Sequence, residues 1–124
     1  MGKTFRNLAA WQRGMELARE VYRETAVMPD SERFGLTSQM RRAAVSVPSN
    51  IAEGYGRGTR TEFGRFLRIA RASLFELWTQ LELATTMNMI EPHVSVYDLV
   101  AETDRVLQGL IRSLEQKESD NETP

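Results

Sequence analysis

The stretch that decides the fold is residues 46–59, SVPSNIAEGYGRGT, in which three glycines alternate before a threonine. A phosphate-binding loop of the Walker type needs a preceding strand and a Gly-Lys-Ser/Thr ending, and a dinucleotide-binding fingerprint needs a different glycine spacing. Neither pattern is present, and the preceding residues follow a helical periodicity. We therefore interpret the stretch as a turn between two helices, with Gly54 or Gly56 in the left-handed conformation that ends a helix.

Upstream of this turn, two segments have the periodicity of amphipathic helices. Apolar or small residues recur in steps of three and four over residues 5–25, which predicts the first helix. A second stripe predicts a helix that begins at Thr37 or Ser38. Pro48 lies inside it, where a proline removes a backbone hydrogen bond and crowds the preceding turn. Because the stripe keeps its phase on both sides of Pro48, a kink is favoured over a break.

Downstream of the turn, two longer helices are predicted. Thr59 or Thr61 can cap the third helix, whose stripe reaches Met87. After a connector that contains Pro92, a fourth helix is predicted from a cap at Ser95. The polar residues 117–124 are predicted to form a disordered C-terminal tail.

These four segments predict the fold class. Strand signals are absent, and four amphipathic helices joined by short connections favour an all-α, antiparallel up-down four-helix bundle over residues 1–116. The chain contains no cysteine, no apolar run long enough to span a membrane and no pattern of a secretory signal. We therefore expect a cytoplasmic protein that does not interact with membranes.

The net charge of −1 hides an uneven distribution. Residues 33–71 hold eight arginines against two glutamates, a local charge of +6, whereas residues 72–124 hold three basic and ten acidic residues, a local charge of −7. The two segments could neutralise each other within the chain or between copies. Alternatively, a basic face could bind an external polyanion such as RNA or DNA. The candidate phosphate contacts are Arg41, Arg42, Arg57, Arg60, Arg65, Arg68 and Arg71.

A second candidate site is a structural polar network. Glu53 lies one helical turn after Asn50, in a region otherwise rich in arginine. A charge near the seam of a bundle is costly unless it is paired. We therefore predict a network of Glu53 and Asn50 with Arg42 or Arg71 as the basic partner.

The residues needed for enzyme chemistry are sparse. His93 is the single histidine and follows a proline in a predicted connector, and no cysteine is present. A di-iron bundle needs paired Glu-x-x-His motifs, which the chain does not contain. We expect no catalytic residue, no metal site and no cofactor.

The central run of residues 34–77 resembles the signature of a known family. It contains Asn50-Ile51-Ala52-Glu53-Gly54, and further matching positions are Leu36, Gln39, Arg41, Arg42, Ala43, Ser46, Arg57, Phe66, Leu67, Ala70, Ser73, Leu74, Glu76 and Leu77. The resemblance is to the four-helix-bundle proteins encoded in 23S rRNA intervening sequences, and it extends over about residues 5–115. Ala72 departs from the glycine that the family usually has before the serine.

This resemblance implies a compact up-down bundle and a ring-like homopentamer. It also implies kinship with the accessory protein of diversity-generating retroelements, which binds nucleic acid and a reverse transcriptase through a basic surface. That relative is basic overall, whereas this chain has a pI near 5.9. We therefore expect a non-catalytic homo-oligomeric scaffold or interaction protein. The alternative is a nucleic-acid-binding accessory protein that uses an arginine-rich face.

Overall fold

The structure is a computed structural model that describes residues 2–91 and 94–122. Short 3-10 turns at Phe5–Asn7 and Asp30–Glu32 precede the first two helices, and the described residues contain no strand. The predicted all-α class is confirmed. The four helices are α1 (Ala9–Thr25), α2 (Leu36–Gly56), α3 (Arg60–Thr86) and α4 (Val94–Glu122).

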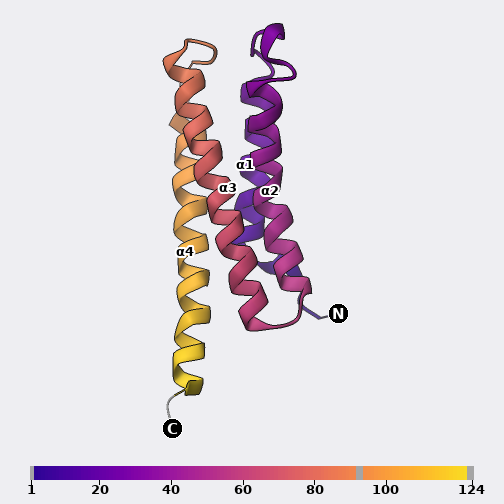
Figure 1. Ribbon diagram of the computed structural model, residues 1–124, viewed down its shortest axis with the longest axis vertical. Helices are drawn as coiled ribbons and strands as arrows, with labels where there is room; N and C mark the ends of the chain where they lie inside the picture. Colours follow the sequence, from indigo (N-terminus) through magenta and orange to yellow (C-terminus); the bar gives the residue numbers. More distant parts are fainter. Residues whose placement is uncertain (1, 92–93, 123–124) are drawn as a thin grey trace.

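The helices form one bundle in which α1 contacts α2, α2 contacts α3, α3 contacts α4, and α4 contacts α1. Figure 1 shows the α1–α2 and α3–α4 connections at one end, which we call the connection end. The α2–α3 turn and both chain termini lie at the other end. Consecutive helices therefore run in opposite directions, in the up-down order that the sequence predicted.

Pro48 lies inside α2, which continues through it without a break. The buried proline ring packs against α1 at Gly14, where an added Cβ would lie 3.4 Å from three Pro48 atoms. A kink in the helix axis stays a prediction. The helix begins at Leu36, one or two residues before the predicted start at Thr37 or Ser38. The Glu32 side chain accepts a hydrogen bond from the Leu36 backbone N–H at 2.9 Å.

The α2–α3 turn has its left-handed residue at Gly58, whose φ is +84°. The assignment of this conformation to Gly54 or Gly56 was wrong, because both lie within α2 and Gly54 is buried there. Thr59, one of the two predicted caps, is the N-cap of α3, which begins at Arg60. Its hydroxyl oxygen accepts a hydrogen bond from the backbone N–H of Glu62 at 3.2 Å.

Removing this cap is expected to destabilise the bundle modestly. Thr59→Ala should lower the free energy of unfolding by about 1 kcal/mol, because one N–H at the start of α3 loses its acceptor. Thr59→Ser keeps the hydroxyl and should stay close to wild type. Urea denaturation followed by circular dichroism measures both variants, and equal losses in the two would contradict the capping role.

The last helix differs from its prediction at both ends. It begins at Val94, so Ser95 lies inside it rather than at its cap, and it continues to Glu122. Pro92 and His93 lie outside the described residues. The backbone of residues 117–122 thus extends α4, because no glycine or proline follows Gly109 before this point and the segment is rich in good helix formers. Disorder of the C-terminal tail stays a prediction.

One apolar core runs along the bundle. Each helix contributes fully buried side chains, among them Leu17, Met40, Leu74 and Leu107. The two tryptophans are partly buried against this core, consistent with their positions on helical stripes. The core fixes the helix faces, and therefore decides which charged residues meet at the seams.

Candidate interaction surfaces

Two candidate arginines join α3 to α4. Arg71 Nε lies 2.7 Å from a carboxylate oxygen of Asp104, whose side chain is only 14% exposed. One turn earlier on α3, Arg68 lies 2.6 Å from Glu115. Arginine donors suit carboxylates well, so each contact combines a hydrogen bond with an ion pair. The basic and acidic segments of the chain therefore partly neutralise each other across this seam.

Two further candidate arginines pair within their own helical segments. Arg65 Nε donates to Glu62 at 2.7 Å, and this hydrogen bond lowers the pKa of Glu62 and raises the pKa of Arg65. Arg57 lies 3.6 Å from the Glu53 carboxylate at the end of α2. All four side chains are largely exposed, so these pairs add little to stability.

The other three candidate arginines have no carboxylate partner among the described residues. Arg41 Nε donates to the Thr25 hydroxyl at 2.9 Å, and its guanidinium lies 4.6 Å from the centre of the Tyr22 ring. Arg42 and Arg60 are exposed and make no hydrogen bond or ion pair in the described part of the chain. Arg42 lies near the start of α2, whereas Arg60 is the first residue of α3, beyond the turn that follows α2. The seven arginines therefore do not form one free basic face.

The predicted polar network is also arranged differently. The Asn50 amide donates to the Ser46 carbonyl at 2.8 Å and to its hydroxyl at 2.9 Å. The Ser46 hydroxyl in turn lies 2.8 Å from that of Ser73 on α3. Glu53 points away from this cluster, with half of its side chain exposed beside Arg57. Asn50 thus belongs to a serine-linked α2–α3 contact, and the predicted union with Glu53 and an arginine was wrong.

The predicted network does not form because the packing of the helices gives its four residues different neighbours. Arg71 is held by Asp104 on α4, and Arg42 lies exposed on α2 without a partner in the described residues. Neither guanidinium bonds the Asn50 amide or the Glu53 carboxylate among the described contacts. Spacing along one helix placed Asn50 and Glu53 together, but the two side chains point to different surroundings.

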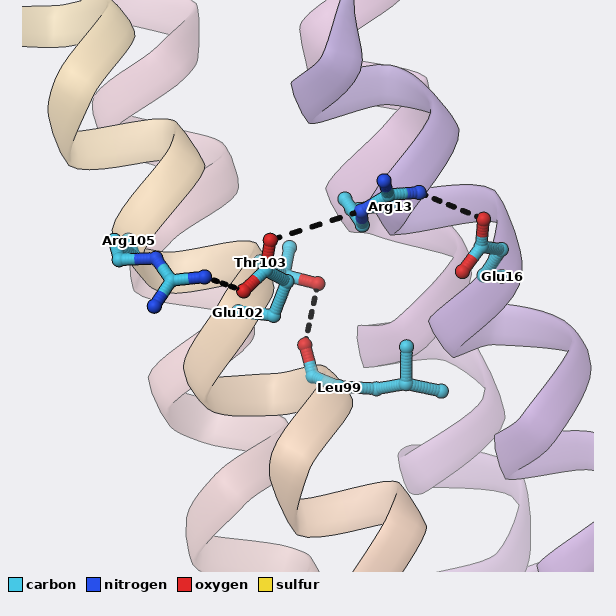
Figure 2. Close-up of polar contacts among 6 residues, drawn as sticks. All are labelled: Arg13, Glu16, Leu99, Glu102, Thr103 and Arg105. Carbon is cyan, nitrogen blue, oxygen red and sulfur yellow. Dashed lines mark hydrogen bonds and ion pairs between the residues drawn. The ribbon is translucent and has the colours of Figure 1, made fainter.

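Figure 2 shows the seam between α1 and α4. Arg13 binds Glu16 of its own helix at 2.8 Å and lies 3.9 Å from Glu102 of α4, which also pairs with Arg105. Beneath these charges, the buried Thr103 hydroxyl donates to the Leu99 carbonyl at 2.6 Å. This seam is closed by contacts within the chain and leaves no free charged group among the residues drawn.

An apolar groove that the sequence analysis did not identify runs along the outer side of α1 and α2. Its volume is about 620 Å³. Tyr22 and Val45 line it and are 46% and 41% exposed. Trp11 and Tyr22 lie on the apolar stripe that the sequence predicts over residues 5–25, and this stripe is wider than the core requires. The other residues that line the groove are Trp11, Met15, Ala18, Arg19, Arg23, Pro48, Ser49 and Ala52.

A second groove of about 600 Å³ continues the first toward the connection end and shares Tyr22 and Val45 with it. Arg33, Arg41 and Arg42 line this groove, and no lining residue carries a carboxylate. The other lining residues are Phe34, Thr37, Ser38 and Ser46. Thr37 is buried, and its hydroxyl oxygen has no hydrogen-bond partner among the described residues. We call Arg33, Phe34, Arg41 and Arg42 the arginine surface.

Two other features are absent from the part of the chain that the structure describes. Among residues 2–91 and 94–122, no group of three or more histidine, aspartate or glutamate side chains could hold a metal ion. No helix in the described part of the chain is long and apolar enough to cross a bilayer. His93, which the sequence places in a predicted connector, lies outside the described residues.

Comparison with known families identifies the relationship of the chain. Residues 6–111 match the sequence model of the family described as 23S rRNA-intervening sequence protein. The chain belongs to this family. The match covers most of all four helices, and the four-helix fold agrees with the resemblance inferred from residues 34–77. A search of curated proteins found no match.

Proposed function

We propose that this member of the 23S rRNA-intervening sequence protein family is a non-catalytic cytoplasmic scaffold that assembles into a homopentamer. The observation that carries the proposal is the uncovered apolar groove on α1 and α2. A groove of this composition is typical of a surface that another protein covers. The number of five subunits comes from the family resemblance, whose members form ring-like homopentamers.

The alternative is a nucleic-acid-binding accessory protein that could act with a reverse transcriptase. It stays a prediction with less support, because Arg57, Arg65, Arg68 and Arg71 each have a carboxylate within 4 Å in the same chain. Phosphate would have to displace these carboxylates, and Glu62 and Glu53 would repel it. The charge of the chain therefore favours assembly over binding of RNA or DNA.

Native mass spectrometry tests the assembly. We expect a mass of 71 kDa for five chains of 14.2 kDa each. Val45→Glu should yield the 14.2-kDa monomer, because it places a carboxylate in the apolar groove. The matched control is Ile69→Glu, since Ile69 is an equally exposed β-branched residue on α3, outside both grooves.

Three results would decide against parts of the proposal. A monomeric wild-type chain at micromolar concentration would refute the assembly itself. Full assembly of the Val45→Glu variant would show that the groove is not covered by another copy. Loss of assembly in Ile69→Glu as well would show that the effect is not specific to the groove. Circular dichroism should confirm that both variants remain helical.

A further inference from the structure

The second groove, which the arginine surface lines, has the composition of an anion-binding site. It holds about 600 Å³, and its charged lining residues are Arg33, Arg41 and Arg42. No lining residue carries a carboxylate, and the four candidate arginines that have carboxylate partners lie outside it. Arg42 also lines a neighbouring groove together with Glu76. Arg33 and Arg41 are therefore the two guanidinium groups best placed to hold an anion.

Both of these guanidinium groups lie over an aromatic ring of the same groove. That of Arg33 lies 5.4 Å from the centre of the Phe34 ring, and that of Arg41 lies 4.6 Å from the centre of the Tyr22 ring. A guanidinium on a ring face keeps its N–H donors in its own plane, where an anion can accept from them. The Thr25 hydroxyl uses only the Nε donor of Arg41. The groove therefore offers donors that are already held in place.

A buried hydroxyl in this groove lacks a partner. Thr37 lines the groove and is only 8% exposed, and its Oγ1 has no hydrogen-bond partner among the described residues. The hydroxyls of Thr25, Thr85 and Thr103 instead donate to the carbonyl one turn earlier in their helices. An unpaired buried hydroxyl is unfavourable. Threonine has two accessible χ1 rotamers in a helix, so rotation lets this hydroxyl donate to a ligand oxygen in the groove.

The start of α2 adds to the preference for an anion. The groove lies at the N-terminus of this 21-residue helix, where the aligned peptide dipoles favour negative charge. Glu32 precedes the helix, but its carboxylate accepts a hydrogen bond from the Leu36 N–H and does not line the groove. The acidic side chain next to Arg33 in the sequence is therefore engaged by the helix end and leaves the groove itself positive.

The size and the aromatic lining of the groove indicate a ligand larger than a bare anion. Sites for small molecules have volumes of roughly 300–1,000 Å³, and this groove lies within that range. Phe34 is 90% exposed, although aromatic rings gain free energy when they are buried. A planar base stacks well on an aromatic side chain, and a phosphate group pairs well with guanidinium groups. A nucleotide combines both groups in one small molecule.

We infer that the groove binds a free nucleoside monophosphate, with its phosphate on Arg33 and Arg41 and its base against the Phe34 ring. The site is built by one chain, so it does not depend on the proposed homo-oligomer. It also differs from a nucleic-acid interface, because it needs one pocket rather than a track of arginines along the helices.

Isothermal titration calorimetry of the wild-type chain with adenosine 5′-monophosphate (AMP) tests the site. We expect saturable binding about 10-fold tighter than that of ribose 5-phosphate, which lacks the base, or of adenosine, which lacks the phosphate. Arg33→Gln/Arg41→Gln should weaken the binding of AMP by about 10-fold or more, because the phosphate loses charged donors. Phe34→Ala should weaken the binding of AMP but not that of ribose 5-phosphate. The matched control is Arg60→Gln/Arg112→Gln, at two exposed arginines outside the groove, which should bind AMP like wild type.

Thr37→Val gives two effects of opposite sign. The substitution keeps the shape of the side chain and removes the unpaired hydroxyl, so it should raise the melting temperature of the chain without ligand. It should also weaken the binding of AMP, because the ligand loses a hydrogen-bond donor. A valine variant that binds AMP as tightly as wild type would overturn the placement of the ligand beside Thr37.

Other results would overturn the inference as a whole. These are the absence of saturable binding at millimolar AMP, binding of ribose 5-phosphate as tight as that of AMP, and equal losses in the control and in Arg33→Gln/Arg41→Gln. A 5′-phosphorylated tetranucleotide that binds more than about 10-fold tighter than AMP would replace the free nucleotide with the end of a nucleic-acid strand. Arg33→Gln alone, at an exposed position, keeps the test decisive if loss of the Arg41–Thr25 contact prevents folding.

Discussion

Replacing Gly54 with alanine is expected to lower the free energy of unfolding by about 2 kcal/mol. A Cβ at this buried position of α2 would lie 2.5 Å from the Cβ of Phe66 and 3.3 Å from Cδ1 of Phe63. Because the Phe66 Cβ is fixed to the α3 backbone, side-chain rotation cannot relieve the contact, and the two helices have to separate. The better helix propensity of alanine, about 1 kcal/mol, offsets only part of this cost.

The same substitution at Gly109 is the matched control. Gly109 lies inside α4 and has nothing within 4 Å of its added Cβ, so Gly109→Ala should raise the free energy of unfolding by about 0.5–1 kcal/mol. Urea denaturation in the Val45→Glu background measures both variants without a contribution from subunit dissociation. Equal changes at the two glycines would disprove the close approach of α2 and α3 at Gly54.

Gly54 also illustrates what the sequence could and could not predict about the fold. Helical stripes predicted the four helices and their order, because burial of one face is a property of each helix by itself. The role of Gly54 depends instead on how closely α3 approaches α2, and periodicity contains no such distance. Of three alternating glycines, Gly58 adopts the left-handed conformation and Gly54 permits helix contact. Their spacing alone did not separate these roles.

The candidate site was less predictable than the fold for a related reason. The sequence showed that residues 33–71 are basic and residues 72–124 are acidic, and it allowed the hypothesis that these segments neutralise each other. Arg71 and Asp104 are 33 residues apart, and Arg68 and Glu115 are 47 apart. Their pairing depends on the register of α3 against α4, which the stripes do not fix. The sequence analysis therefore treated the seven arginines as one group. In the structure, four of them have a carboxylate partner and three have none among the described residues.

The arginines without a carboxylate partner at the start of α2 were only partly anticipated. Arg41 and Arg42 were among the candidates, but Arg33 and Phe34 were not, because they lie in the α1–α2 connection where no periodicity applies. An arginine next to an aromatic residue in a short connection was the available signal. The loop position brings both to the start of α2, and only the packed bundle shows that no carboxylate lines the same groove.

Replacing Leu74 with alanine is expected to have the largest effect on stability. Leu74 lies near the middle of α3 and is fully buried in the core. Removing three buried carbons loses transfer free energy and leaves a cavity, which costs about 2–5 kcal/mol. The free energy of unfolding is a small difference between large opposing contributions, so we expect this change to remove a third or more of it. Urea denaturation in the Val45→Glu background measures the loss.

Leu83→Ala is the comparison that separates stability from assembly. Leu83 lies on the same helix but is 47% exposed, so its truncation should change the free energy of unfolding of the monomer by about 0.5 kcal/mol or less. In the wild-type background the same truncation removes an exposed apolar side chain that the assembly is expected to bury, so the assembly should dissociate at a higher protein concentration. A loss of assembly without a loss of monomer stability would show that a partner subunit contacts Leu83. A loss of monomer stability with unchanged assembly would show that Leu83 stabilises the fold and does not lie in the interface.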